Sequence, residues 1–303
     1  MKPAQQILGH LAATFTISVW GITFISTKFL LGSFTPVEIM AFRLALALLA
    51  LFAVSLPSLA HSKLDRQSLR DEWKFVAAGF CGVTLFFLCQ NIALAYTLTA
   101  NVSVLLSVAP LFTALVSRAA FKEKLAANFF LGFTVAMIGI ILIAFNGSVV
   151  LKLNPLGDLL SIVAALGWAC YSALIRKINA PPGALLAVTR KVFFYGLLLL
   201  VPLLPLVGFR LGLERLTVLP NLLNLLFLGA VASALCFATW NYAVQRLGPV
   251  KTSAYIYVVP VVTIVASLLL LREPITLVAG IGMALILTGM MLSERGPAVS
   301  SPA

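Results

Sequence analysis

Residues 103–139 read SVLLSVAPLFTALVSRAAFKEKLAANFFLGFTVAMIG, and residues 253–289 read SAYIYVVPVVTIVASLLLLREPITLVAGIGMALILTG. The second stretch repeats the pattern of the first at a displacement of 150 residues, and the repeat extends without a gap to 79–139 and 229–289. Apolar helices share leucine and alanine by chance, but shared asparagine, proline, glutamate and glycine in one register indicate a duplicated unit. The identical pairs are Gly79/Gly229, Leu85/Leu235, Phe87/Phe237, Asn91/Asn241, Ala93/Ala243, Ser103/Ser253, Val108/Val258, Pro110/Pro260, Thr113/Thr263, Ser117/Ser267, Glu123/Glu273, Gly132/Gly282 and Gly139/Gly289.

The repeat also reaches the beginning of each half, where the displacement is 148 residues. The pairs matched there are Gly9/Gly157, Trp20/Trp168 and Lys28/Arg176. We therefore predict two related units, at 8–147 and 154–293.

The composition is that of a membrane protein. Of the 303 residues, 61% are hydrophobic and 10% are charged, whereas a soluble domain has about 25% charged residues. A membrane-spanning helix needs about 20 mostly apolar residues, and the first apolar run is too long for a signal-peptide core, so we expect it to be retained. The sequence predicts an all-α integral membrane protein with ten transmembrane helices, at 10–31, 37–57, 75–96, 99–120, 126–146, 156–176, 188–208, 221–245, 249–271 and 275–293.

Five spans per unit is an odd number, so the second unit should be inverted in the membrane relative to the first. The chain has 21 Lys and Arg residues. With the N-terminus inside, all but six of these lie on the cytoplasmic side, which fits the positive-inside rule. We predict a bacterial-type inner-membrane protein with both termini and the loop at 57–74 in the cytoplasm. The six cations assigned to the outside are Lys28, Arg43, Lys152, Arg210, Arg215 and Arg272.

Several short motifs recur in order in both units. They are Trp20-Gly21, Asn91-x-Ala93, Pro110-Leu111 and Lys122-Glu123 in the first unit, and Gly167-Trp168-Ala169, Asn241-Tyr242-Ala243, Pro260-Val261 and Arg272-Glu273 in the second. Together they resemble the EamA type of the drug/metabolite transporter superfamily over nearly the whole chain. The resemblance implies an exporter of amino acids or related metabolites, with a central cavity between the two halves.

Eight residues are predicted to line that substrate cavity, because inverted repeats bring equivalent positions together near the bilayer midplane. For the two asparagines the alternative is an interhelical hydrogen bond that only holds the bundle together. For the two prolines it is a static kink, and for the two tryptophans it is packing between the halves. The eight candidates are Trp20, Asn91, Ser107, Pro110, Trp168, Asn241, Tyr257 and Pro260.

Charged residues near the span ends are expected to cap helices, snorkel or form local ion pairs. Glu38, Arg43 and Asp158 belong to this group, as do Glu123 and Glu273. No carboxylate is expected near the midplane, so the sequence offers no clear coupling site for protons. A mostly apolar pocket with a few polar groups favours a neutral or zwitterionic metabolite.

The sequence predicts no catalytic residue, metal site or cofactor. The four cysteines lie in apolar runs without zinc spacing, and the histidines are only His10 and His61.

The expected partners are a small-molecule substrate and the lipid bilayer, with no nucleic acid. A secondary transporter working by alternating access is the leading hypothesis. An intramembrane enzyme would need a catalytic set that the sequence lacks, and a channel or non-transporting membrane scaffold is the alternative.

Overall fold

The fold is helical throughout the part of the chain that the structure describes. The computed structural model describes residues 3–59, 69–96, 99–122, 125–145, 154–178, 184–271 and 276–294, and no strand occurs within these ranges. Nine helical stretches there are long and apolar enough to cross a membrane. A further apolar helix, Leu277–Ser293, is shorter. The prediction of an all-helical protein with many apolar spans is therefore confirmed.

The described residues of the first half of the chain form eight helical elements. They are α1 (Pro3–Leu30), α2 (Pro36–Leu59), α3 (Leu69–Gly79), the π-helix η1 (Phe80–Leu85), α4 (Phe86–Tyr96), α5 (Thr99–Leu106), α6 (Ala109–Phe121) and α7 (Ala127–Phe145). The second half contains α8 (Pro155–Ile178), α9 (Leu185–Leu200), the 3₁₀-helices η2 (Val201–Val207) and η3 (Leu213–Thr217), α10 (Leu219–Leu226), the π-helix η4 (Phe227–Leu235), α11 (Cys236–Leu247), α12 (Pro249–Ala254), the 3₁₀-helix η5 (Tyr255–Val258), α13 (Val259–Leu271) and α14 (Leu277–Glu294).

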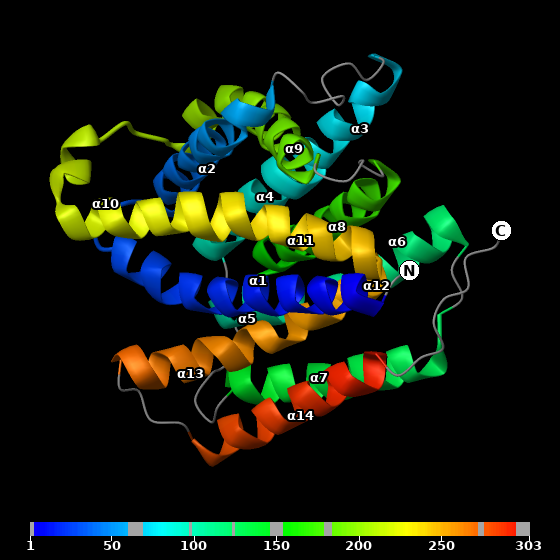
Figure 1. Ribbon diagram of the computed structural model, residues 1–303. Coiled ribbons are helices and arrows are strands. Elements are labelled where there is room, and N and C mark those ends of the chain that lie inside the picture. Colours follow the sequence, from blue (N-terminus) through cyan, green and yellow to red (C-terminus); the bar gives the residue numbers. More distant parts are fainter. Residues whose placement is uncertain are drawn as a thin grey trace.

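The two halves interleave in one bundle (Figure 1). Helix α1 packs against α11 and α13, α2 packs against η4, and α4 packs against α8. Each of these contacts joins one half to the other, so the central core is built from both. In Figure 1, α1 begins and α14 ends on the same side of the bundle.

Two long helical stretches contain a wide π turn. One stretch is built from α3, η1 and α4, and the other from α10, η4 and α11. A displacement of 150 residues carries η1 into η4. Turns of this kind are rare and occur frequently at functional sites.

The matched prolines lie at interruptions of their helices. Helix α5 ends at Leu106 and α6 begins at Ala109, with Pro110 in its first turn. In the second half, η5 separates α12 from α13, and Pro260 follows the first residue of α13. The sequence predicts one kinked helix for each of these spans. The structure differs, because a turn at residues 107–108 and the 3₁₀ segment η5 interrupt the α-helical periodicity.

Side-chain caps hold the first turns of α2 and α8. Glu38 accepts a hydrogen bond from the backbone N–H of Thr35 at 2.8 Å, while the Thr35 hydroxyl accepts one from the N–H of Glu38. Asp158 likewise accepts a bond from the N–H of Asn154. The expected capping roles of Glu38 and Asp158 are confirmed. Arg215 also pairs with Glu38 at 2.9 Å, and this hydrogen bond raises the pKa of Arg215.

Helices α7 and α14 form a close seam lined by glycines, and they lie side by side in Figure 1. Gly132 lies against Gly289, and Gly139 lies against Gly282. A Cβ atom added at Gly139 would lie 2.5 Å from the Gly282 carbonyl oxygen. Small residues permit such a close approach between helices in lipid, where packing drives helix association. All four glycines belong to the matched pairs of the repeat.

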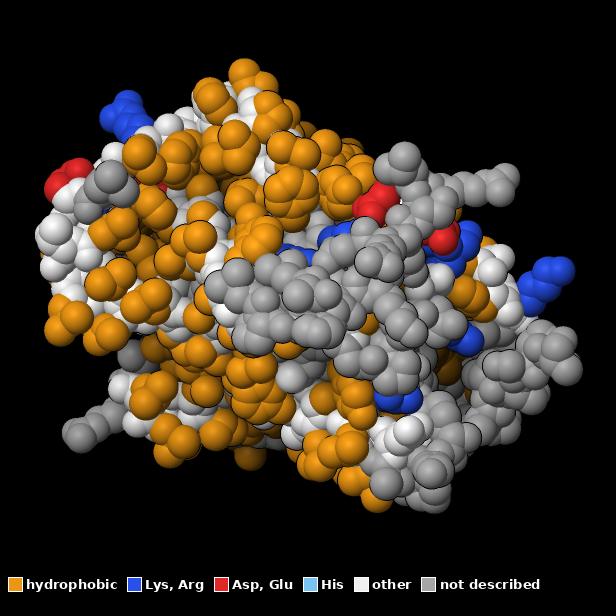
Figure 2. All heavy atoms as spheres, turned by 45° about the horizontal axis from the view of Figure 1, so that its top comes forward, with side chains coloured by type: hydrophobic (Ala, Val, Ile, Leu, Met, Phe, Trp, Pro, Cys, Tyr) orange, Lys and Arg blue, Asp and Glu red, His pale blue; other side chains and the backbone are white. Residues whose placement is uncertain are grey.

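Hydrophobic side chains cover most of the upper and left parts of the face shown in Figure 2, and charged side chains are visible at its left end and in its right half. Large apolar residues are exposed along the helices, among them Leu49 at 65%, Leu198 at 57% and Leu269 at 72%. A soluble protein rarely exposes apolar surface on this scale. The surface therefore agrees with a protein surrounded by lipid.

Candidate functional site

An aromatic cluster lies where the two halves meet. It consists of Trp20 from α1, Trp168 from α8, and Phe237 and Trp240 from α11, and we name it the tryptophan cluster. The ring centroids of Trp20 and Trp168 are 5.4 Å apart, and those of Trp20 and Trp240 are 5.2 Å apart. The rings of Trp168 and Phe237 meet edge-on at 5.6 Å. These separations are within the favourable range for aromatic pairs.

Helical periodicity brings these rings together. On α8, the residues Ala164, Trp168 and Tyr171 are buried at the spacing of a single helix face. On α11, Phe237 and Trp240 are buried in the same way. The two faces meet at α1, where the structure brings the matched tryptophans of the two halves into direct contact.

Two polar groups of the tryptophan cluster have no hydrogen-bond acceptor among the described residues. They are the buried indole N–H groups of Trp168 and Trp240. The indole N–H of Trp20, in contrast, donates to the backbone oxygen of Ala232 at 2.9 Å. A buried donor without a partner is uncommon in a native structure. The two N–H groups are therefore candidates to donate to a bound molecule.

Arg43 lies beside this cluster, inside the bundle. Its Nε donates a hydrogen bond to the Ser233 hydroxyl at 2.5 Å, and its guanidinium carbon lies 5.0 Å from the centre of the Phe87 ring. The ring of Phe87 is in turn 6.2 Å from that of Phe237. The expectation that Arg43 only caps, snorkels or pairs near a span end is wrong, because its side chain reaches the opposite half of the protein.

The two matched asparagines differ in their surroundings. Asn241 is fully buried, and its side chain accepts a hydrogen bond from the Tyr171 hydroxyl at 2.5 Å and donates one to the Thr189 hydroxyl at 3.0 Å. Asn91 is half-buried and donates to the backbone oxygen of Phe87 in its own helix. The geometry of Asn241 favours the interhelical alternative, whereas Asn91 keeps its amide near the face that carries Phe87.

Three further candidates lie at the helix interruptions. Ser107 is buried at the break between α5 and α6, and Pro110 is buried in the first turn of α6. Pro260 is half-buried at the beginning of α13.

Tyr257 lies apart from the other candidates. It is fully buried in a small core that α7, α12 and α14 share, where its ring is 6.4 Å from that of Phe133. Trp20 and Trp168 belong to the main core. The structure therefore groups the matched tryptophans in one core and places Tyr257 in another.

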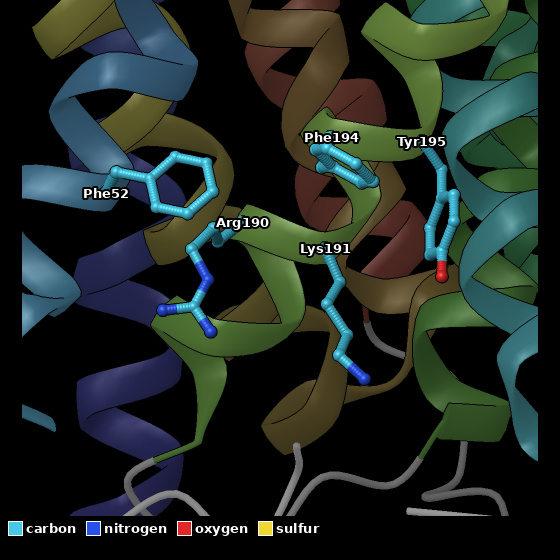
Figure 3. Close-up of a pocket in the computed structure, with 5 residues that line it drawn as sticks. All are labelled: Phe52, Arg190, Lys191, Phe194 and Tyr195. Atoms are coloured by element: carbon cyan, nitrogen blue, oxygen red, sulfur yellow. The ribbon is translucent and has the colours of Figure 1, made fainter. Parts of the chain in front are cut away.

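An open crevice of about 240 Å³ lies elsewhere, between α2 and α9. Its lining residues are Phe52, Arg190, Lys191, Phe194 and Tyr195 (Figure 3). The cationic ends of Arg190 and Lys191 point to the same side of the crevice. Both cations are engaged, since Arg190 donates to Ser55 at 2.8 Å and Lys191 pairs with the Glu72 carboxylate at 2.5 Å.

Metal-binding chemistry has no visible basis in the described part of the chain. It contains no group of three or more His, Cys, Asp or Glu side chains that could hold a metal ion. The matched residues Glu123 and Glu273 lie outside the described ranges.

These features define a class of protein, a multi-pass helical membrane protein with an aromatic and cationic centre shared between two halves. A family model described as the EamA-like transporter family matches residues 7–145 and 155–294. The chain belongs to this family, and it is therefore a membrane transporter of a family that is not enzymatic.

Similar proteins agree with this assignment. The chain is 28% identical to an uncharacterized transporter of Archaeoglobus fulgidus, covering 94% of this chain and 96% of that protein. It is 26% identical to a probable amino-acid metabolite efflux pump of Escherichia coli K12, covering 94% of both. A solved structure that is 18% identical superposes with a TM-score of 0.79 and covers 97% of each chain, which supports the fold.

Proposed function

We propose that this protein exports a small metabolite, such as an amino acid or a related compound, by alternating access across a bacterial inner membrane. The name of the Escherichia coli relative, an amino-acid metabolite efflux pump, supports this choice of substrate. The observation that carries the proposal is the meeting of Trp20 and Trp168, which occupy matched positions in the two halves and have ring centroids 5.4 Å apart. Transporters built from inverted repeats bind substrate where the repeats meet.

The same proposal includes ten membrane crossings in two inverted five-helix units, at 8–147 and 154–293. The glycine seam supports it. Gly132 and Gly139 match Gly282 and Gly289 by sequence, and the contacts pair Gly132 with Gly289 and Gly139 with Gly282. Exchanging the two halves converts each contact into the other, as a two-fold axis between inverted units requires. The matching positions of the π turns in η1 and η4 give further support.

We also propose that both termini face the cytoplasm. Helix α1 begins and α14 ends on the same side of the bundle (Figure 1), as an even number of crossings requires. Arg43 was counted among the six cations on the outside, but its side chain bonds inside the bundle and it is not a loop charge. Without it, the excess of Lys and Arg on the cytoplasmic side is larger. Cysteine introduced at the exposed Arg210 should react with an impermeant thiol reagent in intact spheroplasts, whereas cysteine at Ser68 should not. The opposite labelling pattern would reverse the orientation.

The proposed cavity has the tryptophan cluster at its centre and takes its other lining from the sequence-predicted candidates except Tyr257, which lies in a separate core. Asn91 offers the cleaner test of the two asparagines, because among the described residues its amide bonds only to its own helix. Asn91→Leu should lower transport several-fold while thermal stability stays near that of the wild type, as expected for a residue whose amide meets substrate. Normal transport by this variant would assign Asn91 a structural role.

A channel or a non-transporting membrane scaffold is the alternative. The two are separated from a carrier by counterflow in proteoliposomes that contain the purified protein. The substrate is first identified by comparing metabolites in the medium of cells with and without the protein. A carrier should then show saturable counterflow of that compound, whereas a channel should equilibrate it without counterflow. A scaffold should show no flux in either assay.

A further inference from the structure

We propose that Arg43 is the residue that holds an anionic carboxylate group of the transported metabolite, an inference that rests on the proposed export function. Arg43 is half-buried, and its side chain contacts Ser233 and Phe87 inside the bundle. It is seven residues beyond Pro36, at the start of α2, so it lies about 10 Å along the helix at about 1.5 Å per residue.

A guanidinium at this depth requires a reason. Charged side chains within transmembrane segments are rare, face the bundle interior, and mark substrate pathways by default. Arg43 faces the interior, since its Nε bonds to Ser233 in η4 and its guanidinium lies over the Phe87 ring at the boundary between the halves. Both contacts orient the group and neither one neutralises its charge.

Arg43 forms no ion pair with any carboxylate among the described residues, because the described acidic residues that form ion pairs bind other cations. Its Nε is the only group of this guanidinium that donates a hydrogen bond to a described residue. Within the described part of the chain, the two Nη groups therefore remain available. Their fork geometry matches the two oxygens of a carboxylate, which accept parallel hydrogen bonds from it.

The matched glycines show which residue of the second half takes the place of Arg43. Gly229 lies against the backbone of Arg43 and Ala47, and its partner Gly79 lies against the backbone of Val192 and Gly196. Val192 therefore occupies the position that corresponds to Arg43, so only the first half has a cation there. Arg43 has an aromatic neighbour, Phe87, but no carboxylate from the described residues. In our proposal the substrate supplies that carboxylate.

The aromatic residues near Arg43 also restrict the chemistry of the rest of the transported metabolite. From Phe87 the aromatic surface continues through Phe237 to Trp168 and Trp240, whose indole N–H groups have no acceptor among the described residues. An apolar or aromatic body would pack on these rings, and an ammonium group would be attracted to their faces. One cation balances one anion, so the site fits monocarboxylates and amino-acid zwitterions better than dianions.

The first stage of the experiment identifies the exported compounds. Extracellular metabolites are compared by mass spectrometry for cells expressing wild type, Arg43→Gln, Arg43→Lys or Arg210→Gln, and for cells with an empty vector. Arg210→Gln removes one positive charge from an exposed position outside the site and serves as the matched control. The compounds exported by the wild type should carry a carboxylate. Arg43→Gln should reduce their export about tenfold or more, Arg43→Lys should retain part of it, and Arg210→Gln should match the wild type.

The second stage measures binding. The purified proteins are titrated with the most strongly exported acid and with its primary amide, using the intrinsic fluorescence of the tryptophans. The wild type should bind the acid about tenfold more tightly than the amide or better, and Arg43→Gln should bind both equally. A purely structural arginine would not change this preference. If Arg43→Gln unfolds, Ser233→Ala replaces it, because this variant keeps the charge but removes the bond that orients it, and its preference for the acid should fall several-fold.

The outcomes are distinguishable. If the wild type exports no compound, the proposed function fails, and this inference fails with it. If the wild type exports compounds without an acidic group, or if Arg43→Gln exports the same acids equally well, the function stands and the role of Arg43 is refuted. An unchanged acid-to-amide preference in Arg43→Gln, or in both Arg43→Lys and Ser233→Ala, also refutes it.

Discussion

The glycine seam between α7 and α14 predicts that Gly139→Ala destabilises the protein. The added Cβ would lie 2.5 Å from the Gly282 carbonyl oxygen and 2.9 Å from the Ile286 backbone nitrogen. Ordinary contacts begin near 3.4 Å, so the helices would have to separate by about 0.9 Å, the difference between 3.4 and 2.5 Å. Overpacking of this kind costs about 1–3 kcal/mol. The backbone cannot yield as a flexible side chain would.

The matched control is Gly280→Ala in α14, where an added Cβ meets nothing within 4 Å. Both substitutions gain the same helix propensity, about 1 kcal/mol, so their difference isolates the clash. Free energies of unfolding from titration with sodium dodecyl sulfate in mixed micelles should place Gly139→Ala below Gly280→Ala by about 1–3 kcal/mol. Adding Gly282→Ala to Gly139→Ala should cost less than Gly282→Ala does alone, because the helices have already separated. Equal stability of Gly139→Ala and Gly280→Ala would refute the close seam.

Two further predictions concern hydrogen bonds that hold helices in place. Asn241→Leu removes the acceptor of the buried Tyr171 hydroxyl and the donor that reaches Thr189, so it should lower the free energy of unfolding by about 1–3 kcal/mol; an unchanged thermal midpoint in detergent would show that the network contributes nothing. Thr35→Ala removes the hydroxyl that accepts the N–H of Glu38 at the start of α2 and should cost about 1 kcal/mol in the same assay, whereas Thr35→Ser should be neutral.

The apolar spans could be predicted well because lipid imposes a strong and simple constraint on composition. In the described part of the chain, nine of the ten predicted spans overlap helical stretches long enough to cross a membrane, and the last overlaps a shorter apolar helix. The boundaries were less accurate. The third stretch begins at Asp71 rather than at 75, because polar residues at a helix end continue the backbone pattern after the apolar signal has ended.

The internal breaks of the helices could be predicted only in part. Proline marked the positions near 110 and 260, since it removes a backbone donor. The π turns of η1 and η4 carry no such marker, because glycine, valine and leucine suit either helix type. Their geometry depends on contacts between helices, such as the close approach of Gly79 to the backbone of α9.

The centre of the proposed site was harder to predict than the fold. Matched positions identified Trp20 and Trp168, which the structure brings together. Arg43 has no such signal, because a single sequence does not fix the rotation of an apolar helix about its axis. Its contact with Ser233 depends on that rotation. The direction in which Tyr257 points, into the core that it shares with α7 and α14, depends on rotation in the same way.

The paired π turns also bear on the ancestry of the chain. A π turn uses about one more residue than the α-helix on each turn, and a single inserted residue in an existing helix is the simplest way to create one. Because η1 and η4 overlap at the displacement of 150 that aligns the two halves without a gap, the duplication we propose requires only one such insertion. In this account the insertion occurred in the ancestral five-helix unit, before the gene was duplicated. Both halves have kept it, while most of the surrounding side chains diverged.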